Sequence, residues 1–139
     1  MAPETMVLLV CCGEDSVSVK SGLESSHYTV DIAGSASECL RYVEEKAPDL
    51  ILLDVVLPDM DGFALRARLK TTGAKDVPVI FLAKLDMEMT KRVGILTADD
   101  FVAKPVNVPE LILRIQKAMM MRCYRKPSRQ NTGGRRRTG

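Results

Sequence analysis

The sequence predicts an α/β fold, a three-layer sandwich in which helices cover both faces of a five-stranded parallel sheet. The first observation is that short apolar runs alternate with helix-length amphipathic segments, as in strand–helix–strand units. The second is that these runs have the length and the Val, Ile, Leu and Phe content of buried strands. The third is the length of 139 residues, which has room for one domain with its own core.

The strands are expected at residues 7–11, 29–33, 50–54, 77–82 and 100–103. Right-handed crossovers between parallel strands place helices on either face of such a sheet. The carboxyl ends of the strands then meet at one edge, where sites form in this class of fold. The side chains at these strand ends are therefore the first place to look for chemistry.

The helix after the second strand has the clearest predicted start. Ser35 and Glu38 stand in the pattern of a capping box, in which each side chain accepts a hydrogen bond from the other residue's backbone N–H. Its buried stripe is expected to consist of Ala36, Leu40 and Val43. The capping pattern and the stripe together predict an amphipathic helix that packs on the sheet.

Three other helices are predicted from apolar residues at helical spacing. Their buried faces are expected to be Val19 and Leu23; Met89, Val93 and Leu96; and Leu111, Ile115 and Ala118. The last helix is expected to begin at Pro109, because proline suits the first helical position, and to end near Arg122.

One folded domain is expected at residues 1–121 and a basic tail at residues 122–139. The net charge of +2 conceals this division, because the tail is rich in arginine and contains no acid. With no apolar period, the tail is expected to be disordered. It has no interleaved aromatic residues beyond Tyr124, so a solvated linker, a truncated junction or an expression remnant is favoured over a nucleic-acid-binding segment.

Composition argues against several classes of protein. No apolar run is long enough to span a membrane, and the first residues do not resemble a secretory signal, so a cytoplasmic protein is expected. The four cysteines form no zinc-binding pattern and are expected to be reduced. Because the sequence contains no glycine-rich phosphate loop and no Ser/His/Asp set, we do not expect an enzyme acting on an external substrate.

Asp54 is the strongest candidate for chemistry, because it ends the apolar third strand. A carboxylate at the mouth of such a strand is desolvated on one side yet reachable from the crevice, which makes it a usable nucleophile towards a phosphoryl group. A helix cap or turn residue is the alternative interpretation. Asp59 and Asp61 fit that structural role, because Pro, Asp and Gly of the following segment are turn formers.

Lys104 follows the fifth strand and is expected at the same edge of the sheet as Asp54. Its ammonium could neutralise a phosphoryl oxygen. A lysine at a strand end is more often merely solvated, so the predicted pairing with Asp54 gives it weight. Pro105 follows it and permits a cis peptide bond.

Three strings in order resemble the receiver domains of bacterial response regulators: Leu-Leu-Asp-Val-Val-Leu-Pro-Asp-Met-Asp-Gly-Phe, Val-Pro-Val-Ile-Phe-Leu and Ala-Asp-Asp-Phe-Val-Ala-Lys-Pro. The resemblance covers the chain from about Val7 to Met121. It implies a flavodoxin-like receiver fold with strand order 2-1-3-4-5.

The resemblance also implies a two-component phosphorelay. A histidine kinase or phosphotransfer protein would supply phosphate to Asp54, and Lys104 matches the family's lysine. Mg²⁺ would be held by Asp54, by the backbone carbonyl of Val56 and by an acidic pair that ends the first strand. A downstream protein, an excised output domain or a second copy of the chain would be the further partner.

The chain departs from the family where the acidic pair should stand, because Cys11 and Cys12 occupy that place. A neutral thiol is a poor ligand for a hard cation, so Mg²⁺ binding is expected to be weak or absent. Glu14 or Asp15 could supply a replacement carboxylate. The favoured interpretation is instead that Asp15 or Ser16 caps the first helix.

A second departure concerns the switch that reports phosphorylation. Ala83 stands where the family has a Thr or Ser hydroxyl, and Phe101 is an aromatic partner without a hydroxyl. Two hypotheses follow. The domain either accepts phosphate on Asp54 with impaired metal binding and switching, or it is a pseudo-receiver that binds a protein partner without phosphorylation, through a surface such as its fourth helix, fifth strand and fifth helix.

Overall fold

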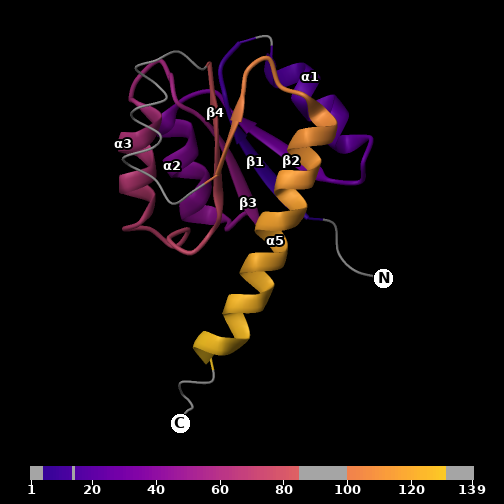
Figure 1. Ribbon diagram of the computed structural model, residues 1–139. Helices are drawn as coiled ribbons and strands as arrows, with labels where there is room; N and C mark the ends of the chain where they lie inside the picture. Colours follow the sequence, from indigo (N-terminus) through magenta and orange to yellow (C-terminus); the bar gives the residue numbers. More distant parts are fainter. Residues whose placement is uncertain (1–4, 14, 85–99, 131–139) are drawn as a thin grey trace.

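The computed structural model describes residues 5–13, 15–84 and 100–130, and it contains a parallel sheet between two layers of helices (Figure 1). The strands are β1 (Met6–Val10), β2 (Thr29–Ala33), β3 (Leu50–Asp54), β4 (Val79–Ala83) and β5 (Asp100–Ala103). They lie in the order β2-β1-β3-β4-β5, and every neighbouring pair is parallel. The predicted fold class and strand order are therefore confirmed.

Three strands have their predicted bounds, and two are shifted. β1 runs over Met6–Val10, one residue earlier than predicted. Cys11 still continues the pairing, because its N–H donates to the carbonyl oxygen of Ala33 at 3.1 Å. β4 begins at Val79, two residues later than predicted, because Pro78 lacks the N–H that a ladder residue donates.

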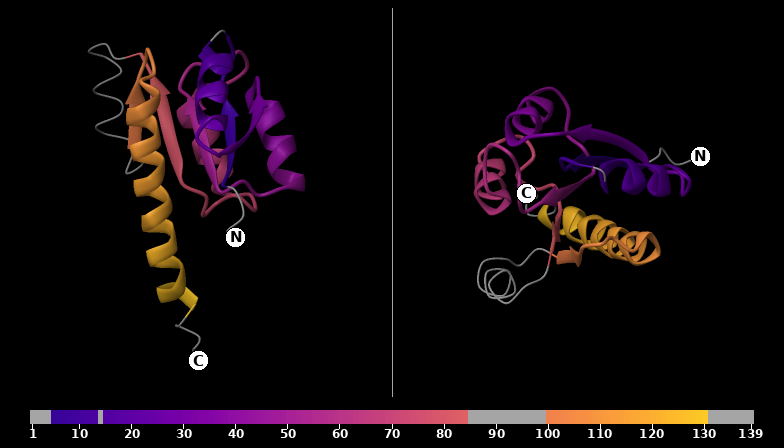
Figure 2. Two further views of the ribbon diagram at one scale, coloured as in Figure 1. Left: turned by 90° about the vertical axis from the view of Figure 1, so that its right-hand side faces the viewer. Right: turned by 90° about the horizontal axis from the view of Figure 1, so that it is seen from above.

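The helices form one layer on each face of the sheet (Figures 1 and 2). They are α1 (Asp15–Glu24), α2 (Ala36–Glu45), α3 (Gly62–Leu69) and α5 (Val108–Gln130). α1 and α5 pack on one face, and α2 and α3 pack on the other. The helix predicted around Met89, Val93 and Leu96 lies outside the described residues.

Alternate residues of the strands divide the core into two clusters. Leu8, Ile51 and Phe81 face α2 and α3, whereas Leu9 and Leu52 face α1 and α5, and all five are fully buried. Because both faces of a parallel sheet are covered, its central strands read as continuous apolar runs. Asp54 is the exception at the end of β3.

The capping box at α2 is confirmed in one half and wrong in the other. The Ser35 hydroxyl accepts a hydrogen bond from the N–H of Glu38 at 3.2 Å. The Glu38 carboxylate, however, reaches one residue further back and accepts from the N–H of Gly34 at 2.9 Å. On the buried face, Ala36 and Val43 are buried as predicted, whereas Leu40 is only partly buried and Cys39 is fully buried.

α5 is longer than predicted at both ends. It begins at Val108 rather than Pro109, and the Asn107 side chain caps it by accepting from the N–H of Glu110 at 2.9 Å. It continues to Gln130, past the predicted end near Arg122, and includes Pro127. Figure 1 shows this second half extending beyond the end of the sheet.

In the parts of the chain that the structure covers, every helix is too short or too polar to cross a bilayer. The predicted boundary between a domain at residues 1–121 and a tail at 122–139 remains an expectation, but α5 runs through residues 122–130, so the expected disorder is wrong for this part of the tail.

Candidate functional site

Asp54 is a buried carboxylate at the carboxyl edge of the sheet. It is the last residue of β3, in which all five residues are buried, and only 4% of its surface is exposed. A carboxylate in such surroundings must be compensated by charge or by hydrogen bonds. Its partners therefore define what this site can do.

Lys104 supplies the charge that Asp54 requires. Its ammonium Nζ lies 2.5 Å from Oδ2 of Asp54, and the two side chains are 21% and 5% exposed. The Lys104 backbone is fixed by its N–H, which donates to the carbonyl oxygen of Ala83 at 2.9 Å. Burial alone would lower the pKa of Lys104, but the hydrogen bond and charge of Asp54 outweigh it and raise that pKa. The following peptide bond, to Pro105, is cis.

Cys11 supplies a second donor to the same carboxylate oxygen. Its Sγ lies 3.6 Å from Oδ2 of Asp54, and the residue is 2% exposed. Burial, followed by the negative charge of Asp54, raises the pKa of the thiol to about 11. Cys11 is therefore a neutral S–H donor at neutral pH.

The loop after β3 folds back onto Asp54. The N–H of Val56 donates to Oδ1 of Asp54 at 3.1 Å, and the N–H of Gly62 donates to the carbonyl oxygen of Val55 at 2.7 Å. Val56 and Asp61 form an isolated bridge that closes the loop. Each oxygen of the Asp54 carboxylate is thus held by a donor from a different part of the chain.

Asp59 and Asp61 have structural roles in this loop, as predicted, because both carboxylates accept hydrogen bonds from backbone N–H groups at the start of a helix. Asp61 is the N-cap of α3 and accepts from the N–H of Phe63 at 2.7 Å. Asp59 accepts from the N–H groups of Ala36 and Ser37, at 2.8 and 3.0 Å, and so holds the start of α2 against the loop. These two backbone hydrogen bonds lower the pKa of Asp59.

The two candidate switch positions lie on neighbouring strands. Ala83 is the last residue of β4, is 2% exposed, and pairs with Ala103 of β5. Phe101 pairs with Phe81 and packs, partly buried, against the core cluster of α2 and α3. A methyl group at the end of β4 offers no donor to a group attached to Asp54.

This geometry can be set beside known proteins. A family model for the response regulator receiver domain matches residues 16–116, which include both Asp54 and Lys104. The chain belongs to the receiver domain family. Receiver domains are signalling domains rather than enzymes in the ordinary sense, and they work in two-component signalling.

Solved receiver domains have the same fold. A receiver domain of a signal transduction histidine kinase from Syntrophus aciditrophicus is 30% identical, with a TM-score of 0.75 over 84% of this chain and 90% of that one. A CheY-like receiver domain protein from Methanospirillum hungatei is 26% identical, with a TM-score of 0.75 over 88% and 99%. The receiver domain of sensor histidine kinase PA1611 from Pseudomonas aeruginosa, with a magnesium ion coordinated in its active site cleft, shares the fold at 23% identity and a TM-score of 0.77 over 84% and 98%.

The structure describes only some of the residues at which the magnesium ligands of a receiver domain are expected. Cys12, the other residue at the expected acidic pair, is exposed, and Glu14 lies outside the described residues. Asp15 is exposed and is the first residue of α1, and its negative charge contributes to the raised pKa values of both Cys11 and Lys104. Within the described part of the chain, no cluster of three His, Cys, Asp or Glu side chains could hold a metal ion.

The predicted cap of α1 is wrong for both candidates. Asp15 and Ser16 both lie inside the helix, and the Ser16 hydroxyl donates to the carbonyl oxygen of Gly13 at 2.8 Å. Gly13 has a positive φ of 112°, which turns the chain sharply between β1 and α1. The turn therefore determines the start of α1, one residue earlier than the sequence suggests.

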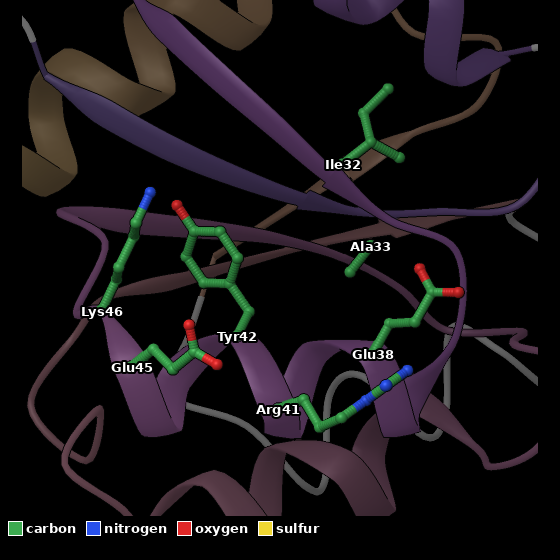
Figure 3. Close-up of a pocket in the computed structure, with 7 residues that line it drawn as sticks. All are labelled: Ile32, Ala33, Glu38, Arg41, Tyr42, Glu45 and Lys46. Atoms are coloured by element: carbon green, nitrogen blue, oxygen red, sulfur yellow. The ribbon is translucent and has the colours of Figure 1, made fainter.

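A groove of about 360 Å³ lies away from Asp54, between α2 and the edge strand β2. Figure 3 shows Tyr42 of α2 and Lys46, the residue that follows α2, beside Ala33 and Ile32 of β2. The Tyr42 hydroxyl donates to Asp31 at 2.7 Å, and Arg41, Glu38 and Glu45 complete a lining of mixed charge. The Tyr42 hydroxyl is already hydrogen-bonded, and none of the lining residues is a buried nucleophile. The groove therefore offers a binding surface rather than a reaction centre.

Sequence reasoning missed two contacts of the site. The bond from Cys11 to Asp54 was not expected, because a cysteine after an apolar strand reads as a small buried hydrophobe. The contact of Asp59 with α2 joins residues more than twenty positions apart, and nothing local indicates it. The Gly62 that follows the loop was the one available signal of a close backbone approach.

Proposed function

We propose that Asp54 accepts a phosphoryl group from a histidine kinase or phosphotransfer protein of a two-component phosphorelay in the cytoplasm. The observation that supports this most is the ion pair of Asp54 with Lys104, at 2.5 Å, at the carboxyl edge of the sheet. A buried carboxylate is held there as an anion beside a cation that can also bind phosphate.

The chemistry follows from the charges. A carboxylate oxygen attacks phosphorus, and the donor group leaves with the electron pair of the bond that breaks. The Lys104 ammonium reduces the repulsion between the carboxylate and the anionic donor. Because phosphoryl transfer depends on positioning and charge neutralisation, the acceptor and the lysine form the minimal site.

Magnesium binding is proposed to be weak or absent. The ion would neutralise phosphoryl oxygens in a typical receiver domain. Here the Cys11 thiol is neutral, and the Asp54 carboxylate is already paired with the Lys104 ammonium. The site would offer a hard cation the carboxylate of Asp54 and the backbone carbonyl oxygen of Val56 as ligands. Lys104 is then the main source of positive charge for transfer.

Signal transmission is proposed to be impaired as well. Ala83 cannot turn a hydroxyl towards a phosphoryl group on Asp54, and Phe101 packs without a hydroxyl tether. Replacing Ala83 with threonine should therefore extend the NMR chemical-shift changes caused by beryllofluoride from the surroundings of Asp54 to β5. Equal chemical-shift changes in the wild type and in Ala83→Thr would show that signal transmission does not depend on residue 83.

Intact-mass spectrometry after incubation with acetyl phosphate tests the acceptor role. We expect one phosphate per chain in the wild type and in Asp59→Asn, an exposed loop aspartate that serves as the matched control. Asp54→Asn should gain none. Equal uptake by Asp54→Asn would place the acceptor elsewhere.

The alternative is a pseudo-receiver that binds a protein partner without phosphorylation. Exposed apolar residues on α5 favour it, because Leu113 and Met120 are 66% and 71% exposed and stand seven positions apart on one side of the helix. A downstream protein or a second copy of the chain could pack there. This alternative would be favoured if the wild type forms no phosphate adduct and if it dimerises while Leu113→Lys does not.

A further inference from the structure

We infer that Cys11 is a positioning residue for Asp54: its S–H group keeps Oδ2 hydrogen-bonded while Lys104 turns to the incoming phosphoryl group, so that Oδ1 attacks. This inference rests on the proposed function, in which Asp54 is the acceptor. It assigns a role to the residue that stands where the family has a carboxylate.

The two oxygens of Asp54 have unequal partners. Oδ2 accepts from Lys104 Nζ at 2.5 Å and from Cys11 Sγ at 3.6 Å. In the part of the chain that the structure describes, Oδ1 accepts one hydrogen bond, from the N–H of Val56 at 3.1 Å. A carboxylate oxygen offers two lone pairs, so Oδ1 keeps one for attack.

The two donors to Oδ2 differ in their freedom to move. Cys11 is 2% exposed, and its backbone N–H is tied to the carbonyl oxygen of Ala33 at 3.1 Å. Lys104 has a flexible four-carbon side chain that is 21% exposed. When the ammonium moves to an anionic donor, the thiol stays in place and holds the carboxylate plane.

The transfer step balances in atoms and electrons, and the Cys11 thiol neither forms nor breaks a covalent bond in it. With acetyl phosphate, a lone pair of Oδ1 forms the new O–P bond, the P–O bond to the acetyl group breaks, and acetate leaves with that electron pair. Cys11 keeps its proton throughout, because the thiol acts only as a hydrogen-bond donor to Oδ2. Its contribution is orientation, which affects the rate of transfer rather than donor binding.

The first test is spectroscopic and does not depend on activity. The infrared S–H stretching band of Cys11, identified by its loss in Cys11→Ala, should lie at lower frequency than that of Cys39. Cys39 is fully buried, and burial alone raises its thiol pKa, so it is an internal reference without a carboxylate partner. The Cys11 band should move towards the Cys39 frequency in Asp54→Ala, where the longer contact of the thiol with the carbonyl oxygen of Cys12, at 3.9 Å, remains, and a band that does not move would overturn the hydrogen bond.

The second test separates positioning from packing. Cys11→Ala should lower kcat for phosphorylation by acetyl phosphate about fivefold with little change in KM, and Cys11→Ser, which keeps a donor, should recover most of the loss. Cys39→Ala removes an equally buried thiol and should match the wild type. Equal rates for Cys11→Ala and Cys39→Ala, or no recovery in Cys11→Ser, would contradict the role of Cys11. If the wild type takes up no phosphate, the proposed function is overturned instead. The infrared band would still show whether the Cys11 thiol is hydrogen-bonded to Asp54.

Discussion

Gly62 lies against the backbone of Asp54, so closely that a Cβ on Gly62 would come within 2.4 Å of the Asp54 carbonyl oxygen. The obstructing atoms belong to the backbone at the end of β3, which cannot move aside without displacing the candidate acceptor. The glycine therefore allows the loop after β3 to return to the strand.

Gly62→Ala should destabilise the domain by about 1–3 kcal/mol, the usual cost of overpacking a tight contact. Urea denaturation would measure this loss. Gly73→Ala is the matched control, because a Cβ there meets nothing within 4 Å, and its stability should stay within about 0.5 kcal/mol of the wild type. Equal stability of the two variants would contradict the close approach.

Lys104→Met should destabilise the fold at neutral pH by about 2 kcal/mol, because it leaves the Asp54 carboxylate without a compensating charge. The expected value lies below that of a fully buried pair, since the Lys104 side chain is 21% exposed. Asp54→Asn in the Lys104→Met background should restore most of the loss. A double-mutant cycle by urea denaturation measures the coupling, and additive effects would argue against a stabilising ion pair.

Cys11→Asp should raise the magnesium affinity above that of the wild type, since it adds a second carboxylate beside Asp54. Titration calorimetry should show a gain of at least about tenfold, equivalent to about 1.4 kcal/mol. Added Mg²⁺ should also raise the Tm of this variant while leaving the wild type unchanged. Cys11→Asn, of similar size but uncharged, should behave as the wild type does, and tight Mg²⁺ binding by the wild type would contradict the assignment.

Asp59 should make the stability depend on pH in the acid range. Hydrogen bonds from Ala36 and Ser37 lower its pKa in the folded protein, so its contribution is complete above the unfolded pKa of about 4 and disappears as the pH falls through the folded value. The Tm difference between the wild type and Asp59→Asn should therefore be largest near neutral pH and shrink in acid. A constant difference from neutral pH to about pH 3 would show that the charge of Asp59 does not act on α2.

Local patterns predicted the scaffold because they depend on neighbouring residues. The apolar runs indicated every strand, and Pro78 explains the shifted start of β4. The pairing of Asp54 with Lys104 followed from topology, since parallel strands bring their carboxyl ends to one edge. The end of α5 was misjudged because the residues after Arg122 show no apolar period, although the helix continues through them to Gln130.

The finer structure of the site depends on contacts that no local pattern encodes. Whether Cys11 points to Asp54 depends on the side of β1 that faces the crevice, and a shift of one residue would reverse it. The hydrogen bonds of Asp59 depend on how α2 packs beside the loop after β3. Such contacts became visible only after the strands were placed in register.

The central claim is that Asp54 is the phosphoacceptor of this receiver domain. Reduction of the acetyl-phosphate-treated protein with borohydride converts an aspartyl phosphate to homoserine, and peptide mass spectrometry then locates the modified residue. We expect homoserine at position 54 alone, at a level that falls in Lys104→Met. Homoserine at Asp59 or Asp61, or at no position, would contradict the claim.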